Sequence, residues 1–152
     1  MLLANAAGPR DNRELESRPD VLVYTSAPLA SGLEIIGPVS ATVYVRASRP
    51  YFDIFVRVCD VEPTGRSVNI CDGLVRVTAE NPATVRDVRV DLWPAAHRFA
   101  TGHRLRVQVS GGAHPRFARN TGSGEPLATA TALVPVDVEV VDGSTLHIMV
   151  LE

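Results

Sequence analysis

The chain has 152 residues, of which 45% are apolar and 21% charged, the composition of one ordinary globular domain, so a wholly disordered chain is excluded. Its formal net charge is −2, which gives no reason to expect a nucleic acid as partner. All 15 basic residues are Arg, which excludes lysine-based Schiff-base chemistry and a Walker-A lysine. No apolar run approaches the roughly 20 residues of a membrane helix. The first residues, MLLANAAG, lack the pattern of a secretion signal, and we expect a cytoplasmic location.

β-Branched residues dominate the chain, because Val, Ile and Thr make up 37 of its 152 residues. Such side chains fit a pleated sheet better than a helix. The clearest alternation runs from Val39 to Arg46, where every odd position is apolar and every even position can face water. One dry face and one wet face are typical of antiparallel sheets.

Similar patterns, separated by turn residues, predict most of the other strands. The predicted strands cover residues 21–25, 34–36, 39–46, 54–61, 68–77, 88–92, 104–109, 136–140 and 145–151. The pair Gly37-Pro38 is expected to be a turn, Pro94 and Pro115 are expected to end strands, and at most one helical turn is expected, around 94–99. So many strands in one domain indicate a two-sheet sandwich or a closed barrel, and we favour an all-β jelly-roll sandwich.

Two segments lie outside the strand pattern. Residues 8–20 are polar, contain two prolines, and are expected to form an extended strap. Residues 110–133 are rich in glycine and form a loop of uncommon length, and such loops are usually functional or lie in an interface.

Catalytic serine signals are weak. An α/β-hydrolase needs a Gly-x-Ser-x-Gly turn between a strand and a helix, and the nearest approach here is Ser123 between Gly122 and Gly124. Its spacing is wrong and no helix follows, so we interpret this segment as a loop tip. We therefore expect no catalytic residue in this chain.

The four histidines are not spaced as metal ligands, and no His-Glu-x-x-His motif occurs. His103 is in phase with the apolar residues of the strand that follows, so its ring should point toward the core, and His97 precedes it across a turn. A half-buried imidazole that donates to a backbone carbonyl is favoured over a metal or acid–base role for both. His147 should be an ordinary strand residue.

The remaining reactive or binding side chains also have simple structural interpretations. Cys59 and Cys71 are expected to be buried, unreactive thiols. We expect no cofactor and no metal site, with a calcium ion at a sandwich edge as a minor alternative. For Trp93, packing in the core or in an interface is favoured over a sugar-stacking platform.

Four segments, in order, resemble one family. They are residues 18–26 (RPDVLVYTS), 60–67 (DVEPTGRS), 91–106 (DLWPAAHRFATGHRLR) and 114–122 (HPRFARNTG). Together they resemble the C-terminal domain of the X-prolyl dipeptidyl-peptidase / cocaine-esterase (CocE/NonD) family of serine hydrolases. The third segment is similar to the family signature, in which His97, Gly102, His103 and Arg104 stand at matching positions.

The resemblance implies a jelly roll of galactose-binding-like topology that packs against an α/β-hydrolase domain and its cap. The family's catalytic triad lies in the hydrolase domain, so the resemblance transfers no catalytic residue to this chain. It implies that residues 1–19 are a linker from a hydrolase region absent here and that residues 20–152 form the domain. The hydrolase and cap domains are the expected partners; no membrane is expected, and a homo-oligomer is left open.

The long loop supplies most of the expected interface residues, because Arg is favoured at interfaces. The candidates for domain contact are Trp93, Arg116, Phe117, Arg119 and Asn120. A merely solvated basic loop is the alternative. Two departures from the family concern turns. Thr64 replaces an Asp, which should leave the turn intact and remove one local acceptor, and Gly111-Gly112 replace serines, which should loosen that loop.

The sequence leaves three alternative functions for this chain. The first is an accessory domain that braces a serine hydrolase, and it predicts an extended apolar patch on the isolated chain. The second is a carbohydrate-binding module, which predicts an exposed aromatic side chain beside convergent polar groups. The third is a self-sufficient enzyme that uses Ser123, which lacks the rest of the required machinery.

Overall fold

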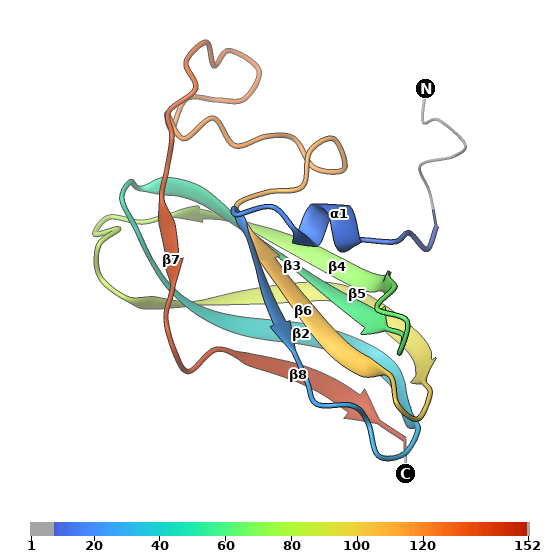
Figure 1. Cartoon of the computed structure of the whole chain (residues 1–152). Coiled ribbons are helices and arrows are strands. Elements are labelled where there is room, and N and C mark those ends of the chain that lie inside the picture. The colour runs from blue at the N-terminus through green and yellow to red at the C-terminus, as the bar shows by residue number, and fades with distance from the viewer. Residues whose placement is uncertain (1–7, 152) are drawn as a thin grey trace.

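The computed structural model describes residues 8–151 and is almost entirely β (Figure 1). Its elements are α1 (Arg13–Glu16), β1 (Val21–Thr25), β2 (Leu33–Ala47), β3 (Tyr51–Val61), β4 (Ser67–Thr78), β5 (Arg86–Phe99), β6 (Arg104–Ser110), β7 (Val138–Val140) and β8 (Thr145–Val150). The all-β prediction is confirmed. Within the described residues, no helix is long and apolar enough to cross a membrane.

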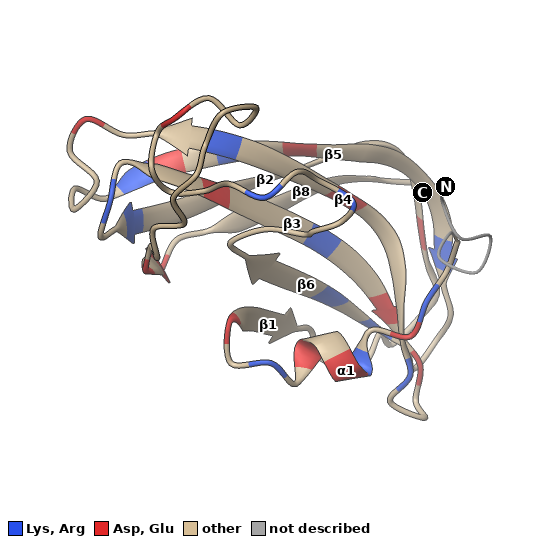
Figure 2. Cartoon of the chain, turned by 90° about the horizontal axis from the view of Figure 1, so that it is seen from above, with Lys and Arg blue, Asp and Glu red and all other residues tan. Residues whose placement is uncertain are grey.

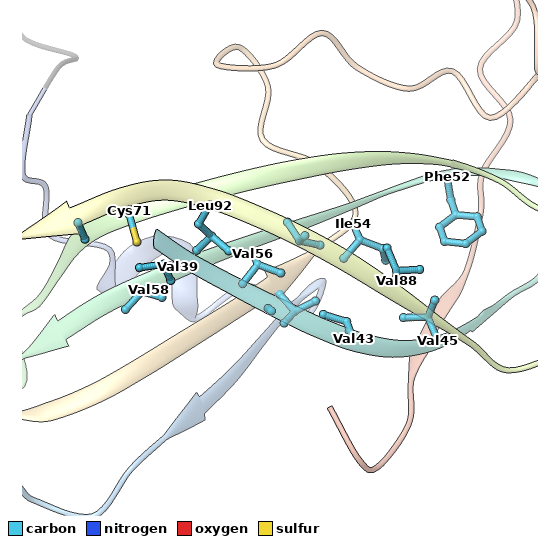
Figure 3. Packing of buried hydrophobic residues seen from close by; sticks show 14 of the residues in the cluster. Val39, Val43, Val45, Phe52, Ile54, Val56, Val58, Cys71, Val88 and Leu92 are labelled. Carbon is cyan, nitrogen blue, oxygen red and sulfur yellow. The ribbon is translucent and has the colours of Figure 1, made fainter. Parts of the chain in front are cut away.

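The strands form two antiparallel sheets that face each other as a sandwich. Sheet A has the order β1-β6-β3-β4. Sheet B is centred on β2, which pairs with β5 along one edge and with β8 and then β7 along the other. The inward faces of both sheets supply the core, which Figure 3 shows between β2, β3, β4 and β5. The core side chains labelled there are Val39, Val43, Val45, Phe52, Ile54, Val56, Val58, Cys71, Val88 and Leu92.

Strand β2 joins two ranges that the sequence predicts separately, so the expected turn at Gly37-Pro38 is wrong. Gly37 pairs with Ala95 and Val39 pairs with Leu92, so the single residue Pro38 stands opposite two residues of β5. This is a β-bulge, a place where a strand tolerates proline because one ladder donor is lost anyway. Gly37 accommodates the local bend with a φ of 118°.

The same bulge explains why β5 is longer than the sequence predicts. The expected helical turn over 94–99 is wrong, because β5 continues to Phe99, and Pro94 lies inside the strand rather than at its end. The extra residue shifts the alternation by one place, so Leu92 and then Ala95 face inward. Alternation of apolar and polar residues therefore no longer indicates a strand beyond Leu92. Pro115 likewise ends no strand, since β6 already ends at Ser110.

The strap over residues 8–20 is not fully extended, because it contains the single helical turn α1. Asn12 is buried, its backbone N–H donates to the carbonyl of Ser67, and its side-chain oxygen accepts from Arg57. Glu16 accepts from Ser67, Arg106 and Gln108. Figure 2 shows α1 beside β1 and β6, so the strap covers part of the outer face of sheet A. The predicted linker 1–19 begins in residues 1–7, which lie outside the described residues.

The turn between β3 and β4, which contains Thr64, is intact, as expected. Gly65 N–H donates to the Glu62 carbonyl, and the Glu62 N–H donates to the Arg66 carbonyl. The Thr64 hydroxyl accepts from the Arg66 N–H at 3.4 Å, so the expected loss of a local acceptor is wrong. A threonine hydroxyl replaces the aspartate oxygen in this turn.

Candidate functional site

The family signature converges on one carboxylate. Asp60, near the end of β3, is buried, and its Oδ2 lies 2.9 Å from Nε2 of His97 on β5. Its Oδ1 lies 2.8 Å from Nδ1 of His103, in the turn before β6. Because β3 and β5 belong to different sheets, Asp60 links sheet A, sheet B and the β5–β6 turn.

The turn itself is held by the other signature residues. Gly102 has a φ of 83°, a conformation that favours glycine, and its N–H donates to the carbonyl of Leu29. Arg104 donates to the carbonyl of Ser26 at 3.0 Å. The expectation that each imidazole donates to a backbone carbonyl is therefore wrong: both contact the Asp60 carboxylate. Sequence patterns missed Asp60, because alternation marks it only as an inward residue.

Ser123 has only neighbours from its own loop as partners. Its hydroxyl lies 3.0 Å from the hydroxyl of Thr121 and donates to Glu125 at 3.3 Å. Among residues 8–151, no serine hydroxyl forms a hydrogen bond with an imidazole. The contacts of Ser123 are those of a loop tip.

A serine, a histidine and an aspartate do meet in one row on the outer face of sheet B. Ser40 of β2 stands directly opposite Asp91 of β5 on one side and His147 of β8 on the other. In a catalytic triad the imidazole stands between the serine and the carboxylate, whereas here the serine stands between the other two. The His147 ring contacts Thr145, and Asp91 pairs with Arg89. The row therefore lacks the order that nucleophile activation needs.

The outer face of sheet A carries cross-strand ion pairs. Arg76 of β4 donates to both oxygens of the buried Asp53 of β3, each at 2.9 Å, and this carboxylate raises the pKa of the Arg76 guanidinium. Four residues further along β3, Arg57 pairs with the buried Asp72 at 3.2 Å. Charges buried beneath a covering segment need such partners.

The long loop is the covering segment, and three of the predicted interface residues contact sheet A. Arg116 forms an ion pair with Asp72 at 2.8 Å. The ring of Phe117 lies 6.1 Å from the ring of Phe55, tilted by 59°. Asn120 donates to Asp53 at 2.7 Å. These three side chains hold the loop against sheet A of the same domain.

The other two interface candidates are exposed, and they lie apart. Arg119 is exposed on the same loop, and Trp93, 67% exposed, is on the outer face of sheet B beside the bulge. The alternative that Trp93 packs in the core is wrong. A shallow hollow of about 320 Å³ lies next to it, lined among others by Pro38, Asp91 and Met149. The five candidates are thus divided between two opposite faces of the sandwich.

The thiols behave as expected. Cys59 and Cys71 are buried and unpaired, and burial raises their pKa to about 12 and about 11, respectively. A thiol with so high a pKa is a poor nucleophile at neutral pH. Within the described part of the chain, no group of three or more His, Cys, Asp or Glu residues could hold a metal ion.

Fold and site together define a β-sandwich in which the signature residues His97, Gly102, His103 and Arg104 make structural contacts that hold segments of the domain together. Residues 3–134 match the family model of the X-Pro dipeptidyl-peptidase C-terminal non-catalytic domain, and the chain belongs to this family. The resemblance drawn from the sequence is confirmed.

Known proteins similar to this chain are longer hydrolases. The chain is 35% identical over 130 residues to cocaine esterase of Rhodococcus sp., a match that covers 80% of this chain and 23% of that enzyme. Two solved structures, an aminopeptidase from a marine-sediment Thaumarchaeota archaeon and an α-amino acid ester hydrolase, superpose with TM-scores of 0.84 and 0.83 at 24% identity. Each match covers 93% of this chain and 27% of the other chain, and shows a shared fold. In these relatives the domain is one part of a larger chain.

Proposed function

We propose that this chain braces the catalytic part of a serine hydrolase of the X-prolyl dipeptidyl-peptidase / cocaine-esterase class, and that it takes no part in bond breaking. The observation that carries the proposal is the match of residues 3–134 to the non-catalytic domain of that family. The contacts of His97 and His103 with Asp60 also support the proposal, because both imidazoles join segments of the fold.

We also propose that the sandwich is a jelly roll of galactose-binding-like topology, and that the α/β-hydrolase domain and its cap are its partners. The two facing antiparallel sheets and the long connections between them support this topology. Trp93, Arg116 and Arg119 are the predicted contact residues that remain exposed for a partner, although Arg116 also pairs with Asp72. Phe117 and Asn120 would act indirectly, by fixing the shape of the loop that carries Arg116 and Arg119.

A replacement experiment tests the bracing role. Cocaine esterase is prepared without the 130 residues that match this chain, and again with this chain fused in their place. The fusion should have a higher melting temperature than the truncated enzyme and should regain ester hydrolysis. A truncated enzyme that is already as stable and as active as the fusion would contradict the proposal.

One observation favours a second candidate, a carbohydrate-binding module. The exposed Trp93 faces the same side as Asp91 and Arg89, and the neighbouring hollow is lined by polar groups that include Ser40 and His147. An aromatic ring beside convergent polar groups suits a sugar ring. Calorimetric titration with a panel of monosaccharides decides: heat of binding that disappears in Trp93→Ala supports this candidate, and no heat with any sugar removes it.

A further inference from the structure

One side of the sandwich is left open between β1 and β8. At the opposite side β4 and β5 lie together, because a Cβ atom on Gly73 would lie only 2.3 Å from the carbonyl oxygen of Asp91. The strand orders therefore place β1 and β8 at the other side. There sheet A continues through β6 to β1, whereas sheet B stops at β8. The second edge of β8 pairs with no strand among residues 8–151.

Side chains of β1 that face the interior are not covered. Leu22 pairs with Val109 of β6, and Tyr24 pairs with Val107. Paired residues of adjacent strands point to the same face of a sheet, and Val109 belongs to the buried core. Leu22 and Tyr24 thus point inward, yet they are 40% and 50% exposed, since sheet B does not extend above them.

The end of β8 shows the same feature. Val150 pairs with Ile35, which lies in the core, so Val150 also faces inward, but it is 49% exposed. Ile148, the preceding inward residue of β8, is only half-buried. We call the strip formed by Leu22, Tyr24, Ile148 and Val150 the open margin.

The free edge of β8 is also unprotected. Exposed edge strands usually carry charges or proline that prevent pairing with another strand. The sequence of β8, Thr-Leu-His-Ile-Met-Val, contains no Lys, Arg, Asp, Glu or Pro. Its unpaired backbone groups and the open margin are what an added strand would need: hydrogen-bond partners along one edge and an apolar surface for alternate side chains.

We infer that the free edge of β8 receives one further β-strand, supplied by the rest of the longer hydrolase polypeptide of which this domain is a part. The inference rests on the proposed function. The strand has alternating apolar side chains that cover the open margin and complete sheet B to the width of sheet A. The related chains support this occupant, because this domain makes up only 23% of cocaine esterase and 27% of each of the two solved chains, which leaves ample polypeptide to provide a strand. A strand on the same polypeptide also has a high effective concentration.

Amide hydrogen exchange tests the inference in two proteins: this chain alone, and the fusion in which it replaces the matched residues of cocaine esterase. In the chain alone, amides on the outer edge of β8 should exchange rapidly. In the fusion they should exchange about tenfold more slowly or slower still. Leu22→Lys and Val150→Lys should barely change the melting temperature of the chain alone, where both sites are wet, and should lower it clearly in the fusion. Val85→Lys, at an equally exposed site before β5, is the matched control and should be neutral in both.

The outcomes separate the inference from the function on which it rests. If the fusion gains stability and activity but keeps rapid exchange in β8 and tolerates both substitutions, strand addition is wrong and the bracing role stands. If the fusion gains neither, the bracing role is wrong. Strand addition is then decided with a synthetic peptide of the cocaine esterase segment that precedes the matched residues: protection of β8 supports it, and none overturns it. Protection in the chain alone that rises with concentration and disappears in Val150→Lys assigns the edge to a second copy and overturns the proposed occupant.

Discussion

Asp60 and His97 connect the two sheets of the sandwich through a contact of 2.9 Å between Oδ2 and Nε2. The second oxygen of the same carboxylate holds His103, which fixes the turn that leads into β6. The ring of His97 also packs edge-on against Phe99, with ring centres 4.8 Å apart. The signature histidines His97 and His103, which are residue types common in catalytic sites, here connect the two sheets through Asp60.

Replacing Asp60 by Ala should destabilise the fold. Both imidazoles lose their carboxylate in a largely buried site, and the expected loss in free energy of unfolding is about 2–4 kcal/mol. Urea unfolding measures it. Asp91→Ala is the control, since Asp91 is 72% exposed in its pair with Arg89 and should change stability little. Equal effects of the two substitutions would show that the Asp60 contacts do not join the sheets.

Glu16→Ala should loosen the strap. The Glu16 side chain is 6% exposed and accepts from Arg106, Ser67 and Gln108, so its removal leaves the partly buried Arg106 guanidinium without its carboxylate partner. The expected cost is about 2–4 kcal/mol, measured by thermal or urea unfolding. Glu14→Ala, on the exposed side of the same helical turn, should cost less than about 0.5 kcal/mol. A Glu16→Ala protein as stable as the parent would mean that the Glu16 contacts do not hold the strap to the domain.

Local patterns in the sequence predict most of this fold, because alternation survives wherever a strand is regular. The strand over Val21–Thr25 is predicted to the residue, and β3, β4, β6 and β8 agree within a few residues of their ends. The largest strand errors lie at one place, the bulge formed by Pro38 against Trp93 and Pro94. At the bulge the alternation of inward and outward residues shifts by one position, and Pro38 and Pro94 resemble strand ends. The sequence therefore predicts a turn within β2 and a helical turn within β5, although both strands are continuous.

The site is less predictable, because its contacts join residues distant in sequence. The loop residues Arg116, Phe117 and Asn120 are well chosen as contact residues, but only the fold shows that they contact Asp72, Phe55 and Asp53 of their own domain. The strap shows the same limit. Nothing in its polar composition indicates that Glu16 becomes buried against sheet A.

Gly73→Ala should disturb the side of the sandwich where β4 meets β5. The added methyl group would overlap the backbone of Asp91 and Leu92, which cannot move aside as a flexible side chain can. We expect a cost of about 1–3 kcal/mol in free energy of unfolding. Gly111→Ala, which would meet no atom within 4 Å, is the matched control in the same unfolding assay. A neutral Gly73→Ala would mean that the strands are further apart than described.

The buried thiols predict a loss of stability in alkali. The pKa of Cys59 is raised from 9.0 to about 12, so above pH 9 the unfolded chain ionises this thiol while the folded chain keeps it neutral. The contribution is complete below pH 9 and is lost as the pH rises toward 12, by about 1.4 kcal/mol per pH unit. Unfolding under reducing conditions at a series of pH values measures the slope. Cys59→Ala should reduce it by that amount, and an unchanged slope would contradict the assignment.

The most direct test of the central claim, that this domain contributes structure while the reacting groups lie on other polypeptide, is the hydrolysis of p-nitrophenyl acetate by the chain alone. The account predicts release of p-nitrophenolate at the rate of buffer, unchanged by Ser40→Ala or Ser123→Ala. Saturable turnover by the purified chain, abolished by either serine substitution while the fold is retained, would contradict it.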